Sequence, residues 1–305
     1  MINVKKEFSS LENVLGISKK TLYTVSNRIH QHYHPVKIPK SKGEYRQLYV
    51  PDDLLKMIQK RISENLLSSE EISPYATAYR KKGGIVANAL PHVGQPSILK
   101  LDIRHFFDHL IYPVVKEKVF PVEKYAEADR ILLSILCVYM DAVPQGAPTS
   151  PVISNIIMKD FDNVVGKWCE QKNITYTRYC DDMTFSGEFH PAEVVVFVKS
   201  ELRKLGLFLN SGKTVFVREG QKHSVTGIVV NEKLSISKEY KKKIRQEMHY
   251  CMKYGVKSHM ERQGMTEEEG SYLRGLLGRV NYVLLVEPDN LQMRAYKTWL
   301  RKQSR

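Results

Sequence analysis

Three aspartates are the residues of this sequence best suited to chemistry. Asp181 and Asp182 are adjacent in the stretch TYTRYCDDMTFSG, and Asp102 ends the apolar stretch SILKLDI. Adjacent aspartates repel each other, and a bound cation would compensate that repulsion. Mg²⁺ prefers carboxylate oxygens together with substrate phosphates. If the strands that carry these aspartates are neighbours in one sheet, the carboxylates meet at one edge and predict a two-metal site for nucleotidyl transfer.

An aspartate pair alone is weak evidence for such a site. Aspartate is common in turns, and the β-branched and aromatic segments on either side of Asp181 and Asp182 are typical of a hairpin. A second pair, Asp52 and Asp53, precedes LLKMIQKRI, where a plain helix N-terminus explains the acids. The catalytic interpretation therefore depends on Asp102 and on the surrounding pattern.

Composition favours a globular protein with a polyanionic partner. The chain has 305 residues, 42% of them hydrophobic, so it is long enough to bury a sizeable core in one domain or a few subdomains. Its formal net charge is +14, which favours a polyanion over an acidic protein or a neutral metabolite. Residues 231–305 hold 16 Lys and Arg against 9 Asp and Glu, giving +7, half of the total.

Cysteine spacing and the N-terminal sequence indicate an intracellular location. The four cysteines match neither a zinc pattern nor a disulfide framework, so reduced thiols are expected. The N-terminal stretch MINVKKEFSSLENVL lacks an apolar signal core, and no apolar run approaches the length of a membrane span. We expect a soluble, cytoplasmic protein without a membrane partner.

The order of elements favours an α+β fold with an antiparallel sheet. Two short helices are expected within residues 7–33, the second beginning at Ser18, and packing helices are favoured there over a DNA-reading helix-turn-helix. The remaining expected elements are two strands within 36–51, a helix over 52–67, a strand ending at 102, a helix over 123–140, a helix after VPQGAPTSP, a hairpin over 175–187, a helix over 191–206, strands at TVFV and SVTGIVV, and three helices from 237 onward.

Four of these stretches resemble the successive palm motifs of reverse transcriptases, in the right order. They are LDIRHFF, PQGAPTSP, YCDD and LGLFLNSGKT. NALPH at 88–92 and VTG at 225–227 further resemble two signatures of the bacterial retron subgroup, although Cys180 stands where that subgroup more often has Ala. The resemblance covers about residues 36–300 and implies a right-hand polymerase with N-terminal helices (1–35), fingers (36–95), a palm with finger elements (96–235) and a helical thumb (236–305).

The resemblance implies the residues of the catalytic centre. Asp102, Asp181 and Asp182 match the carboxylates that hold two Mg²⁺ ions, with Mn²⁺ as an alternative, and Ile103 completes the implied metal set. A hairpin turn without catalysis is the alternative for the aspartate pair. Motif and context together favour catalysis over that alternative.

The resemblance also implies residues that bind the incoming deoxynucleoside triphosphate. Phe107 matches the residue that fills the space of a ribose 2′-hydroxyl, Gln145 a contact to sugar and base, and Lys213 a lysine near the phosphates. Arg46, with Lys40 or alternatively Lys42, would hold the triphosphate, because a guanidinium fork matches phosphate oxygens. The alternatives are a core aromatic, a helix-cap side chain and a solvated charged strand.

Two further regions are candidates for RNA binding. The two retron signatures contribute Asn88, His92, Val225, Thr226 and Gly227, for which a capped helix and a bulged strand are the alternatives. The basic C-terminal stretch SKEYKKKIRQ contributes Lys241, Lys242, Lys243 and Arg245, for which a solubilising surface is the alternative.

For function, the resemblance implies an RNA-directed DNA polymerase that binds its own non-coding RNA. Such an enzyme starts from the 2′-hydroxyl of an internal guanosine and makes branched, RNA-linked single-stranded DNA, in systems implicated in defence against phage. Any effector protein is expected on a separate chain, and RNA trimming would need a host RNase H. The alternatives are an intron-type or diversity-generating enzyme, for whose extra domains 305 residues leave no room, and a catalytically idle RNA-binding scaffold.

Overall fold

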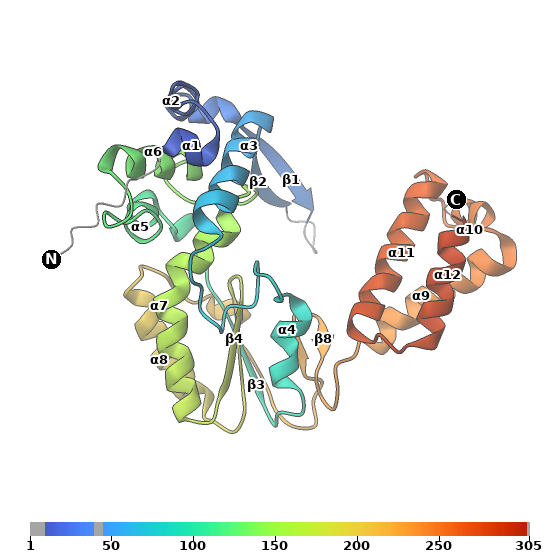
Figure 1. The fold of residues 1–305 in the computed structure, drawn as a ribbon. Coiled ribbons are helices and arrows are strands. Elements are labelled where there is room, and N and C mark those ends of the chain that lie inside the picture. Colours follow the sequence, from blue (N-terminus) through green and yellow to red (C-terminus); the bar gives the residue numbers. More distant parts are fainter. Residues whose placement is uncertain (1–9, 40–44, 304–305) are drawn as a thin grey trace.

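The computed structural model describes residues 10–39 and 45–303 and has three regions (Figure 1). An N-terminal region of helices and one β-hairpin lies above a central sheet, and a bundle of helices formed by the C-terminal residues stands to one side (Figure 1). Lys40, one of the predicted triphosphate ligands, and its alternative Lys42 lie outside the described residues.

The N-terminal region begins with helices α1 (Leu11–Leu15) and α2 (Lys19–Asn27), followed by the antiparallel strands β1 (Tyr33–Pro39) and β2 (Tyr45–Pro51). The expected start at Ser18 is confirmed, since its side chain accepts a hydrogen bond from the Thr21 amide. Helix α3 (Asp53–Ile62) continues as a π-helical turn over Ser63–Leu67. Asp52 caps α3, so this aspartate pair marks a helix start, as expected.

Two helices from later in the chain complete this region. They are α5 (Tyr112–Lys118) and α6 (Glu127–Cys137), which pack against each other, and α6 also contacts α2 and α3. Helix α6 is shorter at both ends than the predicted 123–140, because residues 138–143 turn back through a tight bend in which Met140 and Asp141 adopt positive φ.

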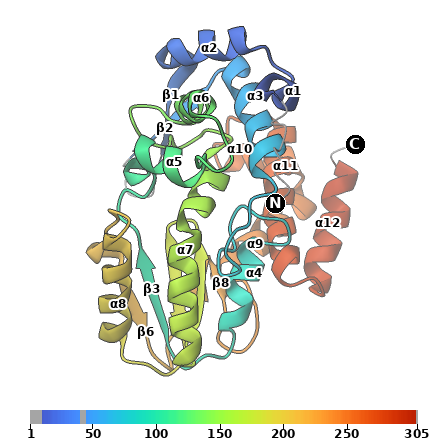
Figure 2. The same ribbon diagram turned by 60° about the vertical axis from the view of Figure 1, so that its left-hand side comes forward.

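The central sheet has the antiparallel strand order β4-β5-β3-β6. Its strands are β3 (Ile98–Asp102), β4 (Thr175–Tyr179), β5 (Asp182–Ser186) and β6 (Val215–Val217). Alternate side chains such as Leu99 and Leu101 share one hydrophobic cluster with α7 (Ser150–Gln171) and α8 (Pro191–Arg203), which run along one side of the sheet (Figure 2). Because side chains alternate along a strand, Lys100 and Asp102 face the other side.

Helix α4 (Ile85–Ala89) and the 3₁₀ turn Leu90–His92 lie on that other side, next to β4 and a short hairpin of β7 (Ser224–Val225) and β8 (Ile228–Val229). Ala89, Ile98 and Val225 belong to a second hydrophobic cluster that extends into the C-terminal bundle. This cluster joins the bundle to the central sheet.

The C-terminal bundle contains four helices where the sequence predicts three. They are α9 (Lys238–Tyr254), α10 (Val256–Arg262), α11 (Glu269–Val286) and α12 (Leu291–Gln303). The prediction of three is wrong because Gly255, at φ 86°, ends α9 and starts α10 directly afterwards. No helix in the described part of the chain is long and apolar enough to cross a membrane.

Candidate active site

The three predicted aspartates lie at one edge of the central sheet. Strands β3 and β5 are neighbours, and Asp102 stands directly opposite Asp182 in their register. Asp181 and Cys180 form the two-residue turn between β4 and β5, where Cys180 adopts φ 60°. The Ile103 amide donates a hydrogen bond of 3.1 Å to the Asp181 carbonyl and so ties the turn to the end of β3. The expected convergence of the two strand ends is confirmed.

Negative charge dominates this edge. Asp102 is 5% exposed and accepts hydrogen bonds from Lys213 Nζ (2.7 Å) and Asn210 Nδ2 (3.1 Å). The bond to Asp102 raises the pKa of Lys213. Partial desolvation of its carboxyl, with the charges of Asp181 and Asp102, raises the pKa of Asp182 to about 6. Lys213 and the partly buried Lys100 offset only part of the charge of the three carboxyl groups, so the edge is suited to binding further positive charge.

The donors at this edge fit Mg²⁺ in kind. They are carboxylate oxygens, which a hard divalent cation prefers, and the repulsion recorded in the raised pKa of Asp182 is what a cation would relieve. With the side chains as they stand, no three His, Cys, Asp or Glu groups within residues 10–39 and 45–303 are arranged around one point to hold an ion. The carboxylate of Asp102 is engaged by Lys213 instead.

A buried ion pair next to the β4–β5 turn stabilises the turn that carries Asp181. The sequence did not predict this pair. Arg178 and Asp162 are both fully buried, and the Arg178 guanidinium donates to Asp162 at 2.6 and 2.8 Å. The same guanidinium donates to the Cys180 carbonyl at 2.8 Å and to Asn155 Oδ1 at 3.2 Å. Tyr176 Oη donates to Asp162 at 2.8 Å. The only signals in the sequence were an arginine within a strand and an aspartate within an otherwise apolar helix stretch.

The two phenylalanines after Asp102 have different surroundings. Phe106 is 3% exposed and belongs to the main core, whereas Phe107 is only partly buried, with its ring 5.3 Å from that of Phe106. Phe106 is therefore a core residue, and Phe107 remains accessible from solvent.

The structure brings Gln145 to the strand that carries Arg46. The Gln145 carbonyl accepts a hydrogen bond of 3.0 Å from the Tyr49 amide, and Arg46 is exposed on the same strand, β2. Gly146 follows at φ 121°, and a Cβ there would lie 3.0 Å from the Tyr49 carbonyl oxygen. This turn needs glycine, because β2 approaches it closely.

Comparison with known proteins identifies the family. A family model described as reverse transcriptase (RNA-dependent DNA polymerase) matches residues 38–250. The retron Ec83 reverse transcriptase of Escherichia coli is 31% identical over 81% of this chain and 81% of its own length. The chain belongs to the retron-type reverse transcriptases.

Two further relatives come from the same group. The retron Ec86 reverse transcriptase of Escherichia coli is 34% identical over 67% of this chain, and the retron Mx65 reverse transcriptase of Myxococcus xanthus is 30% identical over 86% of it. The matches span 65% and 63% of the length of these two relatives. The expected α+β right-hand polymerase fold is confirmed by this membership, while the limits of fingers, palm and thumb stay predictions.

In this retron-type chain the two polar side chains of the NALPH segment are buried, which corrects their expected role as direct RNA contacts. Asn88 and His92 are both 0% exposed. The His92 ring nitrogens bond Ser186 Oγ (2.6 Å) and Thr177 Oγ1 (2.8 Å), and Thr77 Oγ1 donates to Asn88 Oδ1 (2.7 Å). His92 therefore fastens the 3₁₀ turn to the sheet and Asn88 fastens α4 to the loop at Thr77, and neither side chain reaches solvent.

The buried histidine gives a testable pH dependence. Burial lowers the pKa of His92 to about 4, so the folded protein keeps a neutral ring while the unfolded chain protonates below about 6.5. Stability from this residue is complete above pH 6.5 and is lost as pH falls towards 4, by about 3 kcal/mol. Urea unfolding should show a smaller loss over this pH range in His92→Gln. Equal losses in both proteins would contradict the assignment.

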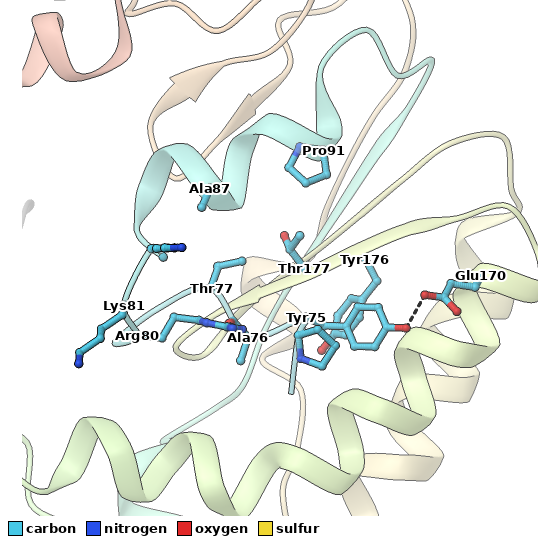
Figure 3. A pocket seen from close by; sticks show the side chains of 13 residues that line it. Tyr75, Ala76, Thr77, Arg80, Lys81, Ala87, Pro91, Glu170, Tyr176 and Thr177 are labelled. Atoms are coloured by element: carbon cyan, nitrogen blue, oxygen red, sulfur yellow. Dashed lines mark hydrogen bonds between the residues drawn. The ribbon is translucent and has the colours of Figure 1, made fainter. Parts of the chain in front are cut away.

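A surface pocket of about 470 Å³ lies beside this segment (Figure 3). Thr77 and Thr177, the partners of Asn88 and His92, line it, and Arg80, Lys81 and Lys82 bring positive charge to it. Asn88 and His92 thus position two residues of a surface pocket that also contains three basic side chains. Arg80 is itself fixed by bonds to the Ser73 and Ala76 carbonyls.

The VTG triplet forms the turn of the β7–β8 hairpin. Val225 is buried, while Thr226 (φ 46°) and Gly227 (φ 83°) are the two turn residues. Positive φ at both positions is the geometry of a tight two-residue hairpin turn. Thr226 Oγ1 donates to the Ile85 carbonyl at 3.1 Å, which joins the hairpin to α4. Gly227 is exposed, whereas Val225 is buried and its side chain cannot contact RNA directly, contrary to the prediction.

The four basic residues predicted on α9 differ in exposure: one forms an ion pair and three are exposed. Lys241 Nζ lies 2.6 Å from Glu287 Oε1, and the side chain is 19% exposed, so this lysine ties α9 to the end of α11. Lys242, Lys243 and Arg245 are exposed. The predicted phosphate contacts therefore rest on these three residues, and Lys241 already has an acidic partner.

Proposed function

We propose that this chain is an RNA-directed DNA polymerase that copies part of a structured RNA. The observation that carries the proposal is the register of β3 and β5, which places Asp102 opposite Asp182 with Asp181 in the adjoining turn. Membership of the retron-type reverse transcriptases supports the same reaction.

The residues at and near this edge have two proposed roles, metal binding and phosphate binding. Asp102, Asp181 and Asp182, with the backbone of Ile103, would hold two Mg²⁺ ions, for which Mn²⁺ is an alternative. When bound, the ions activate a hydroxyl nucleophile and neutralise the leaving pyrophosphate. Lys213, which now neutralises Asp102, has an exposed side chain beside the carboxylates and would contact nucleotide phosphates. Arg46 and Lys40 would hold the triphosphate from the fingers.

Phe107 is the proposed gate against ribonucleotides, because it matches the gate position of reverse transcriptases and its ring is partly exposed. Phe107→Ala should open space for a 2′-hydroxyl, and discrimination against a ribonucleoside triphosphate should fall by about tenfold or more. Steady-state incorporation of matched ribonucleotides and deoxyribonucleotides on one primed template measures this. Tyr112→Ala, a partly buried aromatic a few residues away, is the control and should leave the ratio unchanged. An unchanged ratio in Phe107→Ala would place the gate elsewhere.

The RNA partner would be held by exposed cations and recognised through the retron signatures. Lys242, Lys243 and Arg245 would contact phosphates, which gives affinity without sequence preference. Thr226 and Gly227 form a rigid tip that an RNA could approach closely, and Asn88 and His92 act from below by positioning α4.

As a retron-type enzyme, the chain would start synthesis from the 2′-hydroxyl of an internal guanosine and leave a branched RNA-linked single-stranded DNA. We further propose a role in defence against phage, with a separate effector protein, and RNA trimming by a host RNase H. The test is to purify the protein from cells and sequence its nucleic acid after RNase digestion. DNA carrying one residual guanosine at its 5′ end is expected, and DNA without any RNA linkage would contradict this priming.

A further inference from the structure

A second, smaller pocket lies within the C-terminal bundle, far along the chain from the catalytic aspartates. It has a volume of about 210 Å³ and is formed by α9, α10 and the residues that follow α10. Sites that enclose whole drug-sized ligands are larger, about 300–1,000 Å³. The volume therefore suits a single planar ring system.

His259, on α10, is the unusual member of this pocket. The residue is 5% exposed, and its Nε2 has no hydrogen-bond partner among the described residues. Buried polar atoms without a partner are rare in folded proteins and invite an explanation. The neighbouring carboxylate of Glu247 is not the hydrogen-bond partner of this nitrogen. Arg279 donates to both carboxylate oxygens at 2.6 Å, and Tyr272 Oη donates to one of them at 3.0 Å.

Aromatic and amide side chains surround the histidine. The ring of Tyr250 lies parallel to that of His259, at 9° and 5.6 Å between centroids, and is itself partly exposed. Gln246 and Gln263 also line the pocket, and each amide offers one hydrogen-bond acceptor and two donors. These groups match the face and the edge of a nucleobase.

The charges around the pocket favour a strand with phosphates outside it. Lys243 lines the pocket and is exposed, and Tyr254, stacked near Tyr250, lies 4.9 Å below the Arg262 guanidinium. Glu247 within the pocket disfavours an anion there. A nucleotide with its neutral base inside the pocket and its phosphate on Lys243 keeps the negative charge away from Glu247 and close to the lysine.

We propose that this pocket takes one unpaired nucleobase of a single-stranded nucleic acid. The base edge bonds Gln246 or Gln263 and, after a shift of the side chains that cover it, the buried Nε2 of His259, while Tyr250 contacts the base. The proposal rests on the proposed function, which brings single-stranded RNA and DNA to the chain, and it adds a specific base contact to general binding of phosphates.

The test compares binding of a short adenosine homopolymer RNA, the matching DNA, and an abasic strand of the same length. The wild-type protein should bind either base-bearing strand better than the abasic strand, and the preferred sugar identifies the source of the base. His259→Phe keeps an aromatic ring but removes both ring nitrogens. It should weaken binding of the preferred strand by about tenfold without changing the salt dependence.

His249→Phe is the matched control, since His249 also packs on Tyr250 from α9 but does not line the pocket, and it should bind like wild type. Lys243→Gln should reduce binding of all three strands and lower the salt slope by about one, as loss of one phosphate contact requires. Equal wild-type affinity for base-bearing and abasic strands, or unchanged binding in His259→Phe, would overturn the proposal. Binding is measured without polymerisation, so failure of the catalytic assignment would be seen separately in primer extension.

Discussion

The double variant Asp181→Asn, Asp182→Asn is expected to lose DNA synthesis by about three orders of magnitude or more. Loss of these carboxylates removes metal-based charge stabilisation worth several kcal/mol, and each 1.36 kcal/mol changes a rate about tenfold. Asparagine keeps the size of both side chains, and neither residue is in the core, so the fold and RNA binding should remain. Primer extension and RNA binding are measured on the same preparations.

Asp108→Asn provides the control, because Asp108 is an exposed aspartate six residues after Asp102, with its carboxylate 3.4 Å from the His105 ring. It should polymerise like wild type. Synthesis by the double variant at a rate close to wild type would show that the carboxylates at the β4–β5 turn are not catalytic.

The second large effect is on stability. Asp162→Ala should lower the free energy of unfolding by about 3–5 kcal/mol, because it leaves the Arg178 guanidinium buried without its counter-charge. Asp162 and Arg178 are both 0% exposed and meet at 2.6 Å. The loss should also abolish synthesis, since Arg178 donates to the Cys180 carbonyl in the aspartate turn. Urea unfolding measures the first effect and primer extension the second.

Asp160 offers a matched comparison on the same helix. Its ion pair with Lys118, at 2.9 Å, is exposed, so Asp160→Ala should cost no more than about 1 kcal/mol and leave synthesis intact. If Asp162→Ala were as stable as Asp160→Ala, the buried pair would not hold the turn.

The sequence was sufficient to predict how the three carboxylates meet. A buried strand ending in Asp102 and a hairpin with Asp181 and Asp182 at its turn have local signals, namely apolar runs, β-branched residues and turn residues. Period-two alternation then determines which side chains share a face of the sheet. The cap at Ser18 was predictable for a similar reason, because its hydrogen bond is made within three residues.

Features that depend on contacts far apart in the sequence could not be predicted in this way. Arg178 and Asp162 are 16 positions apart, and nothing local indicates that a strand and a helix place them together in the core. Asn88 and His92 have polar side chains that are typical of a surface, yet Asn88 bonds the loop at Thr77 and His92 bonds β4 and β5, and both are buried. The extra helix, α10, depends on a single backbone conformation at Gly255.

One measurement on the purified wild-type protein tests the proposed polymerase activity most directly: incorporation of labelled deoxynucleotides on a primed RNA template in the presence of Mg²⁺. We predict a DNA strand whose sequence is complementary to the template and whose synthesis requires Asp181 and Asp182. Binding of the primed RNA without any template-dependent DNA product would contradict this activity and leave an RNA-binding scaffold.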